Sequence, residues 1–351
     1  MHRFATLGWH TKASPVLAFF LGRWRCDQRR WRAGCWGWRW CAVSLLAGCS
    51  AMTPVLQQPP ASDFTPVALP GEGGEGGVTL WALQRAERLA PLRYRVIVVP
   101  GSGCAGMGAF ANRYFAGLQH AQVLVLHKPG VSPQARTAAG DCARSFVLQD
   151  RLSTWLAHAR AALRADALQR EGQAPVPQLL VGISEGAELL PALAPEVPHL
   201  AGLVVLSSSG LDPQEAGALQ ADRRGLRADW QALSVEVSGR KPDTAMVQGR
   251  SLGYWRDLWH WPLARPLVQS PWPVLQVWGS DDALVPAAAY ERFAPWAAAR
   301  VLPWCARRLE GADHGLQRSA PSGRDGVQQV WAWTEQWARN PLAGLCGPLA
   351  P

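Results

Sequence analysis

The sequence predicts an α/β fold, with a mostly parallel sheet covered by helices on both faces. Short apolar runs of strand length alternate with segments of helical periodicity. The short runs are apolar at nearly every position, as in strands that are buried on both sides. With 351 residues, the chain is also long enough to bury the core that such a sheet needs.

The first 48 residues have the composition of a targeting segment. They contain eight Lys or Arg residues and one acid, and therefore carry +7 of the net charge of +9. The apolar run 40–48 is too short for a membrane span, which needs about 20 residues, but it suits the apolar part of a signal peptide. The rest of the chain is close to neutral, so we expect no nucleic-acid partner.

The end of this segment predicts lipid attachment. Leu46-Ala47-Gly48-Cys49 resembles the lipobox of bacterial lipoproteins. The resemblance implies that residues 1–48 are a signal segment, and that Cys49 is acylated and becomes the first mature residue. Ser50, in place of Asp, then implies a location on the periplasmic face of the outer membrane. The alternative is a buried apolar segment with an ordinary cysteine.

Residues 49–77 are rich in Pro and then in Gly, which predicts a tether between the lipid and a folded domain at 78–351. In that domain the apolar pattern predicts the following strands: 78–83, 94–99, 122–126, 178–183, 203–206 and 273–278. Helical spacing of apolar residues predicts helices over 152–167 and 326–339. We expect residues 340–351 to form a loose tail, which is pinned if Cys346 is bonded.

Residues 211–272 interrupt the alternation and are mostly helical in pattern. They lie between two predicted strands, so we expect them to form a cap over the carboxyl ends of the strands. Their aromatic residues favour an apolar or aromatic substrate group, or they fill the core of the cap itself. The aromatic residues are Tyr254, Trp255, Trp259 and Trp261.

The cysteines of the mature chain indicate export. Apart from Cys49 there are four, namely Cys104, Cys142, Cys305 and Cys346, and they allow three pairings. The predicted fold brings together Cys104 with Cys142, in the loops after two strands, and Cys305 with Cys346, before the last strand and after the last helix. We predict these two disulfides; the alternative is four free thiols.

The stretch 178–186 contains the motif with the clearest chemistry. A buried strand ends in Gly182-x-Ser184-x-Gly186, the pattern of a nucleophile elbow, in which a strand turns sharply into a helix. The glycines allow the strand and the helix to approach closely. The turn presents the Ser184 hydroxyl, and it directs the amide of Glu185 toward a developing oxyanion.

A serine nucleophile needs an imidazole base and a carboxylate that orients it. The strand 273–278 runs into Gly279-x-x-Asp282-x-x-x-Pro286, and Gly311-x-x-His314-Gly315 follows later. With these three motifs in order, the chain resembles the α/β-hydrolase superfamily over residues 94–340. The resemblance implies Ser184 as nucleophile, His314 as general base and then acid, and Asp282 as the orienting carboxylate.

Two other acids stay open as the third member. Asp281 is the immediate neighbour of Asp282, and Asp212 follows the preceding strand, where some superfamily members carry their acid. Each Asp also suits a turn or a helix cap. The other histidines of the mature chain lack a matching context.

An oxyanion hole needs two backbone donors. One is the amide of Glu185, and we expect the other in Pro100-Gly101-Ser102-Gly103, the counterpart of the family's His-Gly-x loop. Ser102 is the first choice and Gly103 the second. Pro100 stands where the family has His, so the side chain that anchors this loop is missing. Pro191 is expected to end or kink the elbow helix early.

The sequence contains no metal-binding motif and no complete phosphate-binding glycine loop, so neither a metal nor a cofactor is expected.

The prediction is a lipid-anchored serine hydrolase that cleaves an ester or a related acyl bond of a small molecule through an acyl-serine intermediate. One alternative is a peptidase of the proline iminopeptidase or serine aminopeptidase type, with Glu185 or an acid of the cap receiving the substrate amine. The other is a non-catalytic envelope lipoprotein that retains the fold.

Overall fold

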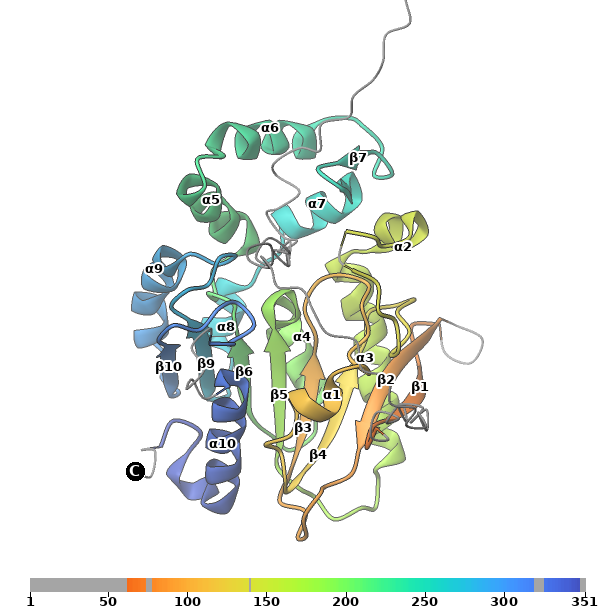
Figure 1. Ribbon diagram of the computed structural model, residues 1–351, viewed down its shortest axis with the longest axis vertical. Coiled ribbons are helices and arrows are strands. Elements are labelled where there is room, and N and C mark those ends of the chain that lie inside the picture. Colours follow the sequence, from red (N-terminus) through yellow and green to blue (C-terminus); the bar gives the residue numbers. More distant parts are fainter. Residues whose placement is uncertain (1–61, 74–77, 139, 319–324, 348–351) are drawn as a thin grey trace, which may run out of the picture.

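The computed structural model describes residues 62–73, 78–138, 140–318 and 325–347, and an eight-stranded sheet runs through them (Figure 1). The strand order is β1-β2-β4-β3-β5-β6-β9-β10. The strands are β1 Thr65–Pro70, β2 Thr79–Arg85, β3 Tyr94–Val99, β4 Ala121–Leu126, β5 Gln178–Ile183, β6 Leu200–Leu206, β9 Val274–Gly279 and β10 Trp304–Leu309.

Strand β2 runs antiparallel to both of its neighbours, and the six strands from β4 to β10 in the sheet order are parallel to one another. The carboxyl ends of these six strands therefore lie at one edge of the sheet. The predicted class, a mostly parallel α/β sheet, is confirmed. The predicted strand 94–99 matches β3, and the predicted helix 326–339 matches α10.

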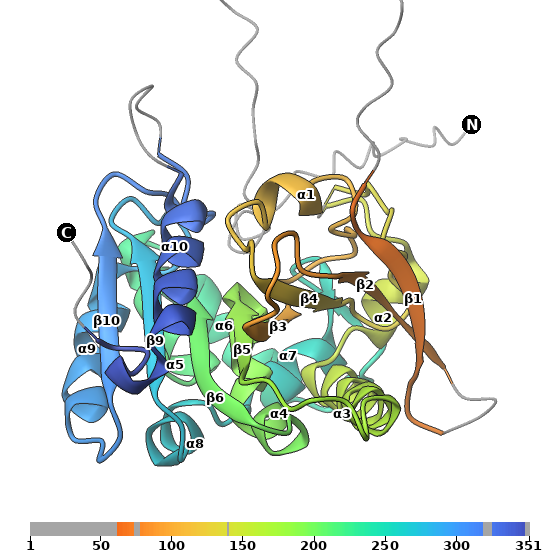
Figure 2. The ribbon, with the colours of Figure 1, turned by 90° about the horizontal axis from the view of Figure 1, so that it is seen from below.

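Helices cover both faces of the sheet, as Figure 2 shows. On one face lie α1 and α10; α3, α4, α8 and α9 lie on the other. Their bounds are α1 Ala111–Tyr114, α3 Leu152–Gln169, α4 Leu190–Leu193, α8 Ala264–Gln269, α9 Ala287–Ala298 and α10 Gly326–Arg339. Two buried clusters result, and successive residues of β5 alternate between them: Leu179 and Val181 face α10, and Leu180 faces α3.

The segment between β6 and β9 adds four helices and a two-stranded sheet. Three of these helices lie together beyond the carboxyl ends of β5 and β6, as Figure 1 shows for α5, α6 and α7. The elements are α5 Pro213–Arg223, α6 Arg227–Ser238, β7 Met246–Val247, β8 Arg250–Ser251 and α7 Leu252–Trp259, followed by α8. We call residues 211–272 the cap.

The aromatic residues of the cap mainly contact the cap itself. Trp259 stacks on Trp230, with ring centroids 4.7 Å apart. The indole of Trp255 donates a hydrogen bond to the carbonyl oxygen of Val247 at 2.9 Å. Tyr254 is buried. These contacts favour the alternative in which the aromatic residues fill the core of the cap, and they leave the expectation of an apolar substrate without support.

One prediction for the segment 49–77 is wrong. The sequence assigned it to a tether, but Thr65–Pro70 forms the edge strand β1, which pairs with β2. Phe64 and Leu69 are buried, because they pack against the sheet. The composition obscured this strand, since proline is rare in strands but tolerated at a sheet edge, where β1 contains Pro66 and Pro70.

Most of the predicted N-terminal features lie outside the described residues. The signal segment 1–48, the acylated Cys49 and residues 50–61 of the tether belong to this part of the chain. Among the residues that the structure describes, no helix combines the length and the apolar character needed to cross a membrane.

Two disulfides have the pairing that the sequence predicted. Cys104 is bonded to Cys142, and Cys305 to Cys346. Cys305 lies within β10 and not before it, because the strand begins at Trp304. The second disulfide joins this strand to the segment after α10, where Leu345 is buried.

Candidate active site

The turn after β5 has the strained geometry of a nucleophile elbow. Ser184 has φ +52°, in the left-handed region, which costs a residue with a Cβ about 1–2 kcal/mol. A Cβ on Gly182 would overlap Ala187, and one on Gly186 would overlap the carbonyl oxygens of Val99 and Pro100. Gly182 therefore lets the helix pack against the end of β5, and Gly186 lets it pack against the end of β3.

The helix that follows the elbow runs on past Pro191 as far as Glu196, so the expectation that Pro191 ends it early is wrong. It begins as a 3₁₀ helix, Ser184–Leu189, continues as α4 and ends in a second 3₁₀ turn, Ala194–Glu196. Pro191 lies in the first turn of α4, where a missing N–H breaks no hydrogen bond of that helix.

The hydroxyl of Ser184 faces His314. Ser184 Oγ lies 2.9 Å from His314 Nε2, and His314 Nδ1 lies 2.8 Å from Asp282 Oδ2 and 3.0 Å from Oδ1. The Asp282 side chain is 2% exposed and that of His314 is 22% exposed. With Nδ1 protonated, the imidazole donates to Asp282, and Nε2 can accept the proton of the serine hydroxyl.

Backbone donors fix the carboxylate of Asp282. Its Oδ1 accepts the N–H groups of Leu284 and Val285, at 2.7 and 2.9 Å. The cap contributes as well, because Arg223 of α5 donates to the carbonyl oxygen of Asp282 at 2.8 Å. Gln220, also of α5, donates to the carbonyl oxygen of Ala283 at 2.8 Å. The loop that holds the acid is thus attached to the cap.

The histidine loop is held by the neighbouring strands. Ser207, at the end of β6, is fully buried and donates from its hydroxyl to the carbonyl oxygen of His314 at 2.6 Å. Asp281 N donates to the carbonyl oxygen of Ala312 at 2.9 Å. A Cβ on Gly279 would overlap that same carbonyl group. Sequence reasoning missed Ser207, whose one signal is its place directly after a buried strand.

The two other candidate acids have different partners. Asp281 is exposed, and its Oδ1 accepts the hydroxyl of Ser280 at 2.8 Å. Asp212 precedes α5, and its Oδ1 accepts the amides of Leu263 and Ala264 at 2.7 and 2.8 Å. Neither is hydrogen bonded to His314, so Asp282 is the acid that the structure brings to the imidazole.

The loop expected to form the oxyanion hole lies beside the nucleophile. A Cβ added to Gly101 would stand 3.5 Å from the Cβ of Ser184 and 3.3 Å from the carbonyl oxygen of Ile183. Ser102 follows Gly101, and Gly103 has φ +104°, which favours glycine. Glu185, the source of the other proposed donor, is the second residue of the 3₁₀ helix.

The side chain of Glu185 belongs to a buried ionic cluster that the sequence did not predict. Lys128 Nζ lies 2.8 Å from Glu185 Oε2 and 2.7 Å from Asp150 Oδ1, and Arg250 of the cap lies 2.7 Å from Asp150 Oδ2. Burial alone would raise the pKa of Glu185, but Lys128 and Arg250 hold it below its usual value. Glu185 Oε2 is thus paired with Lys128, and the Glu185 side chain is buried.

Glu188, one turn further along, differs from Glu185. Burial raises its pKa well above the usual value, and the charges of Glu185 and Asp212 add to this effect. Its backbone carbonyl oxygen accepts a hydrogen bond from the indole N–H of Trp261, in the cap, at 2.9 Å.

Within the described residues, no group of three or more His, Cys, Asp or Glu side chains is arranged to hold a metal ion.

No protein-family model matches the chain, and no curated protein matches it in sequence. Several solved structures are similar in fold. Est1E from Butyrivibrio proteoclasticus aligns with a TM-score of 0.52 at 17% identity, over 79% of this chain and 99% of its own. A thermostable carboxyl esterase from Bacillus coagulans aligns with a TM-score of 0.52 at 13% identity, over 79% of this chain and 100% of its own.

A puromycin-hydrolysing peptidase from Mycobacterium tuberculosis aligns with a TM-score of 0.50 at 17% identity. The alignment covers 83% of this chain but 42% of the peptidase, so this chain spans less than half of that protein. Such low identities establish a shared fold and leave the substrate open. From the sheet, the elbow and these similarities, we conclude that the protein has the α/β-hydrolase fold.

Proposed function

We propose that this protein is a serine hydrolase that cleaves a carboxylic ester or a related acyl bond of a small molecule. The observation that carries the proposal is the hydrogen-bonded line from Ser184 through His314 to Asp282, with distances of 2.9 and 2.8 Å. Nucleophile, base and orienting acid are the three roles that acyl transfer to a serine requires.

In the proposed reaction, His314 takes the proton of Ser184 as the serine oxygen attacks the carbonyl carbon. The oxyanion is stabilised by the amides of Glu185 and Ser102. His314 then gives the proton to the leaving alcohol, and an acyl-serine forms. In the second half, His314 takes a proton from water, which attacks the acyl group, and then returns this proton to the oxygen of Ser184 as the acid leaves.

We propose an ester and not a peptide as the substrate because of the environment of the Glu185 side chain. An aminopeptidase needs an accessible acidic side chain that can receive the substrate amine, whereas Glu185 is buried and its Oε2 is already paired with Lys128 at 2.8 Å. A cap acid would then have to take this role.

The test compares short p-nitrophenyl esters with aminoacyl p-nitroanilides, using the purified wild-type protein and the Ser184→Ala variant. We expect the wild type to hydrolyse the esters, and Ser184→Ala to reduce kcat by about 10⁴-fold or more. Cleavage of anilides without ester turnover would favour the peptidase. Equal rates for both proteins would contradict a serine mechanism.

We also propose that the protein is exported and anchored in the cell envelope through acylated Cys49. The lipobox-like sequence motivates this proposal, and the two disulfides support it, because disulfides persist in oxidising compartments. In a bacterial host fed radiolabelled palmitate, the full-length protein is expected to become labelled and to sediment with membranes. Equal labelling of Cys49→Ser would contradict the proposal.

A further inference from the structure

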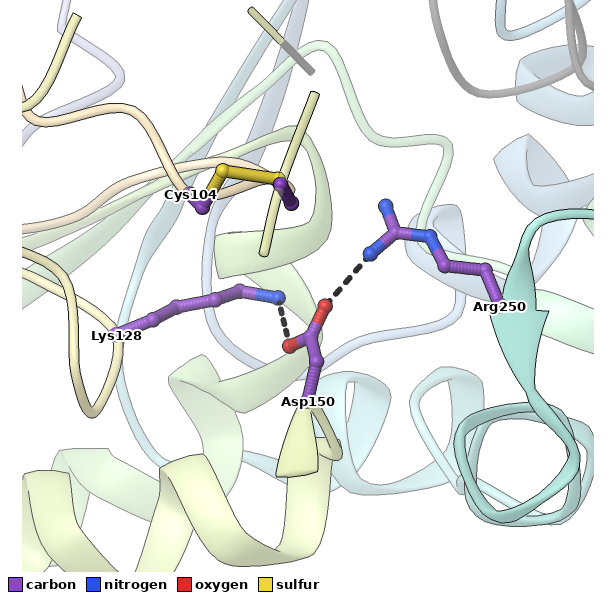
Figure 3. Close-up of a disulfide and its surroundings, with 5 residues drawn as sticks. Cys104, Lys128, Asp150 and Arg250 are labelled. Atoms are coloured by element: carbon purple, nitrogen blue, oxygen red, sulfur yellow. Dashed lines mark hydrogen bonds and ion pairs between the residues drawn. A yellow bond between two sulfur atoms is a disulfide. The ribbon is translucent and has the colours of Figure 1, made fainter. Parts of the chain in front are cut away.

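The segment from Cys142 to Asp150, which includes α2 (Arg144–Gln149), is attached to the site at both of its ends. At one end, Cys142 is bonded to Cys104. At the other end, Asp150 lies between Lys128 and Arg250, as Figure 3 shows. This segment therefore has a covalent attachment at one end and ion pairs at the other.

The first attachment reaches the loop after β3. Cys104 is two residues beyond Ser102, and Gly101 lies against Ser184. The loop has Pro100 where the resembling family has an anchoring His, so another anchor is required. Beyond Cys104 the chain is held by Met107 N, which donates to His127 Nε2 at 3.1 Å. Within the described part of the loop, the disulfide is the covalent anchor nearest to Ser102.

The second attachment reaches the elbow. Lys128 donates to Asp150 and to Glu185, at 2.7 and 2.8 Å, and the three side chains are between 2% and 7% exposed. Glu185 directly follows Ser184. Because these charges are buried, each needs its partner, and a shift of Asp150 would leave Lys128 and Arg250 incompletely paired. The position of α2 is therefore coupled to the position of the elbow.

We propose that the Cys104–Cys142 disulfide, together with Lys128, positions the two backbone amides of the oxyanion hole. This inference rests on the proposed function. The disulfide fixes the loop of Ser102 against α2, and Lys128 fixes Glu185 against the same segment. The cysteines and Lys128 are positioning residues, because they act through the backbone of Ser102 and Glu185.

The chain contains a matched control. The disulfide Cys305–Cys346 spans 41 residues and Cys104–Cys142 spans 38, so the effect of each on the entropy of the unfolded chain is nearly equal. The control disulfide joins β10 to the C-terminal segment, away from Ser102. Loss of either is expected to lower stability similarly, whereas only loss of Cys104–Cys142 is expected to change the oxyanion hole.

The experiment measures kcat and KM for a p-nitrophenyl ester with the double variants Cys104→Ser/Cys142→Ser and Cys305→Ser/Cys346→Ser, well below their melting temperatures. For the first variant, kcat is expected to fall by about 10- to 100-fold with KM nearly unchanged, because loss of a whole donor costs about 10²–10³-fold. The control variant is expected to keep the wild-type kcat. Wild-type kcat in the first variant, or an equal loss in both, would overturn the proposal.

Lys128→Gln provides a second arm if the first variant does not fold, because it leaves both disulfides intact. Its kcat is expected to fall by about tenfold at an unchanged KM, since displacement of one donor loses part of its effect. A wild-type kcat in Lys128→Gln would then overturn the proposal. A wild-type protein without ester turnover would instead contradict the proposed function, whatever the variants do.

Discussion

Ser184 Oγ and His314 Nε2 lie 2.9 Å apart, although 130 positions separate the two residues in the sequence. The contact forms because β5 and β10 are parallel strands of one sheet, and the loops that follow them meet at the same edge. Asp282, from the loop after β9, approaches the other nitrogen of the imidazole. Each of these residues can therefore be tested for one distinct role.

Asp282→Asn is expected to lower kcat by about 10³–10⁴-fold, because an amide in place of the carboxylate can hold His314 in the wrong tautomer. The fold is expected to persist, since the remaining side-chain oxygen can still accept the amides of Leu284 and Val285. Ester kinetics with a melting curve for each protein check both parts.

Asp281→Asn and Asp212→Asn are the controls for that prediction. Asp281 is exposed and contacts Ser280, so its change is expected to leave kcat within about threefold, as for most surface substitutions. Asp212 binds two amides near α8, so its change is expected to lower the melting temperature more than kcat. A fall in kcat for Asp281→Asn as large as the fall for Asp282→Asn would contradict the assignment of Asp282 as the orienting acid.

Gly186→Ala is expected to destabilise the protein and to abolish ester hydrolysis. The added Cβ would overlap the carbonyl oxygens of Val99 and Pro100, which are backbone atoms and cannot rotate away. Overpacking of this kind typically costs about 1–3 kcal/mol of unfolding free energy. Denaturant unfolding measures that loss for Gly186→Ala and for Gly140→Ala, where an added Cβ meets no atom within 4 Å. Equal unfolding free energies for the two variants would show that the elbow tolerates the methyl group.

The stability of the protein is expected to fall as the pH drops from about 6.5 to 4, in part because of His127. Burial lowers the pKa of His127 from 6.5 to about 4, and its neutral Nε2 accepts the amide of Met107. Between these pH values the unfolded chain binds the proton and the folded chain does not, so protonation favours unfolding. The full shift corresponds to about 3 kcal/mol.

His127→Gln isolates this contribution, because an amide oxygen can accept the same hydrogen bond without titrating. Denaturant unfolding of both proteins is measured at several pH values. The free energy of unfolding is expected to fall less steeply with pH in the variant, and the difference between the two proteins is expected to grow toward pH 4. Carboxylates such as Glu185 titrate in both proteins, so their contribution to the pH dependence cancels when the two are compared. Parallel pH profiles would contradict the effect assigned to His127.

The sequence was most informative where local pattern and packing agree. β3 could be predicted to the residue because a run of apolar, mostly β-branched residues, with Arg95 as its one charged member, ends at Pro100. The meeting of Ser184, Asp282 and His314 could also be predicted, since motifs at the ends of parallel strands share one edge of the sheet. The disulfide pairing could be predicted for the same reason, because the predicted fold brings the paired segments together.

The parts that were missed depend on distant contacts. β1 forms only because β2 offers an edge, and the prolines around it masked the two apolar residues that it buries. The buried ionic cluster draws its members from three separate segments, namely Lys128, Asp150 and Arg250. In the sequence, each of them alone predicts an ordinary charged side chain in solvent. One signal was available for Lys128, because it closely follows the buried strand β4.

The central claim is that Ser184 is a nucleophile activated by His314, and covalent labelling tests it most directly. A fluorophosphonate probe is incubated with wild type, Ser184→Ala and His314→Ala, and the modified peptide is identified by mass spectrometry. We expect one probe per wild-type chain, attached to Ser184, no labelling of Ser184→Ala, and labelling of His314→Ala slowed by about 10³-fold or more. Equal labelling of wild type and Ser184→Ala, or attachment at another residue, would contradict the account.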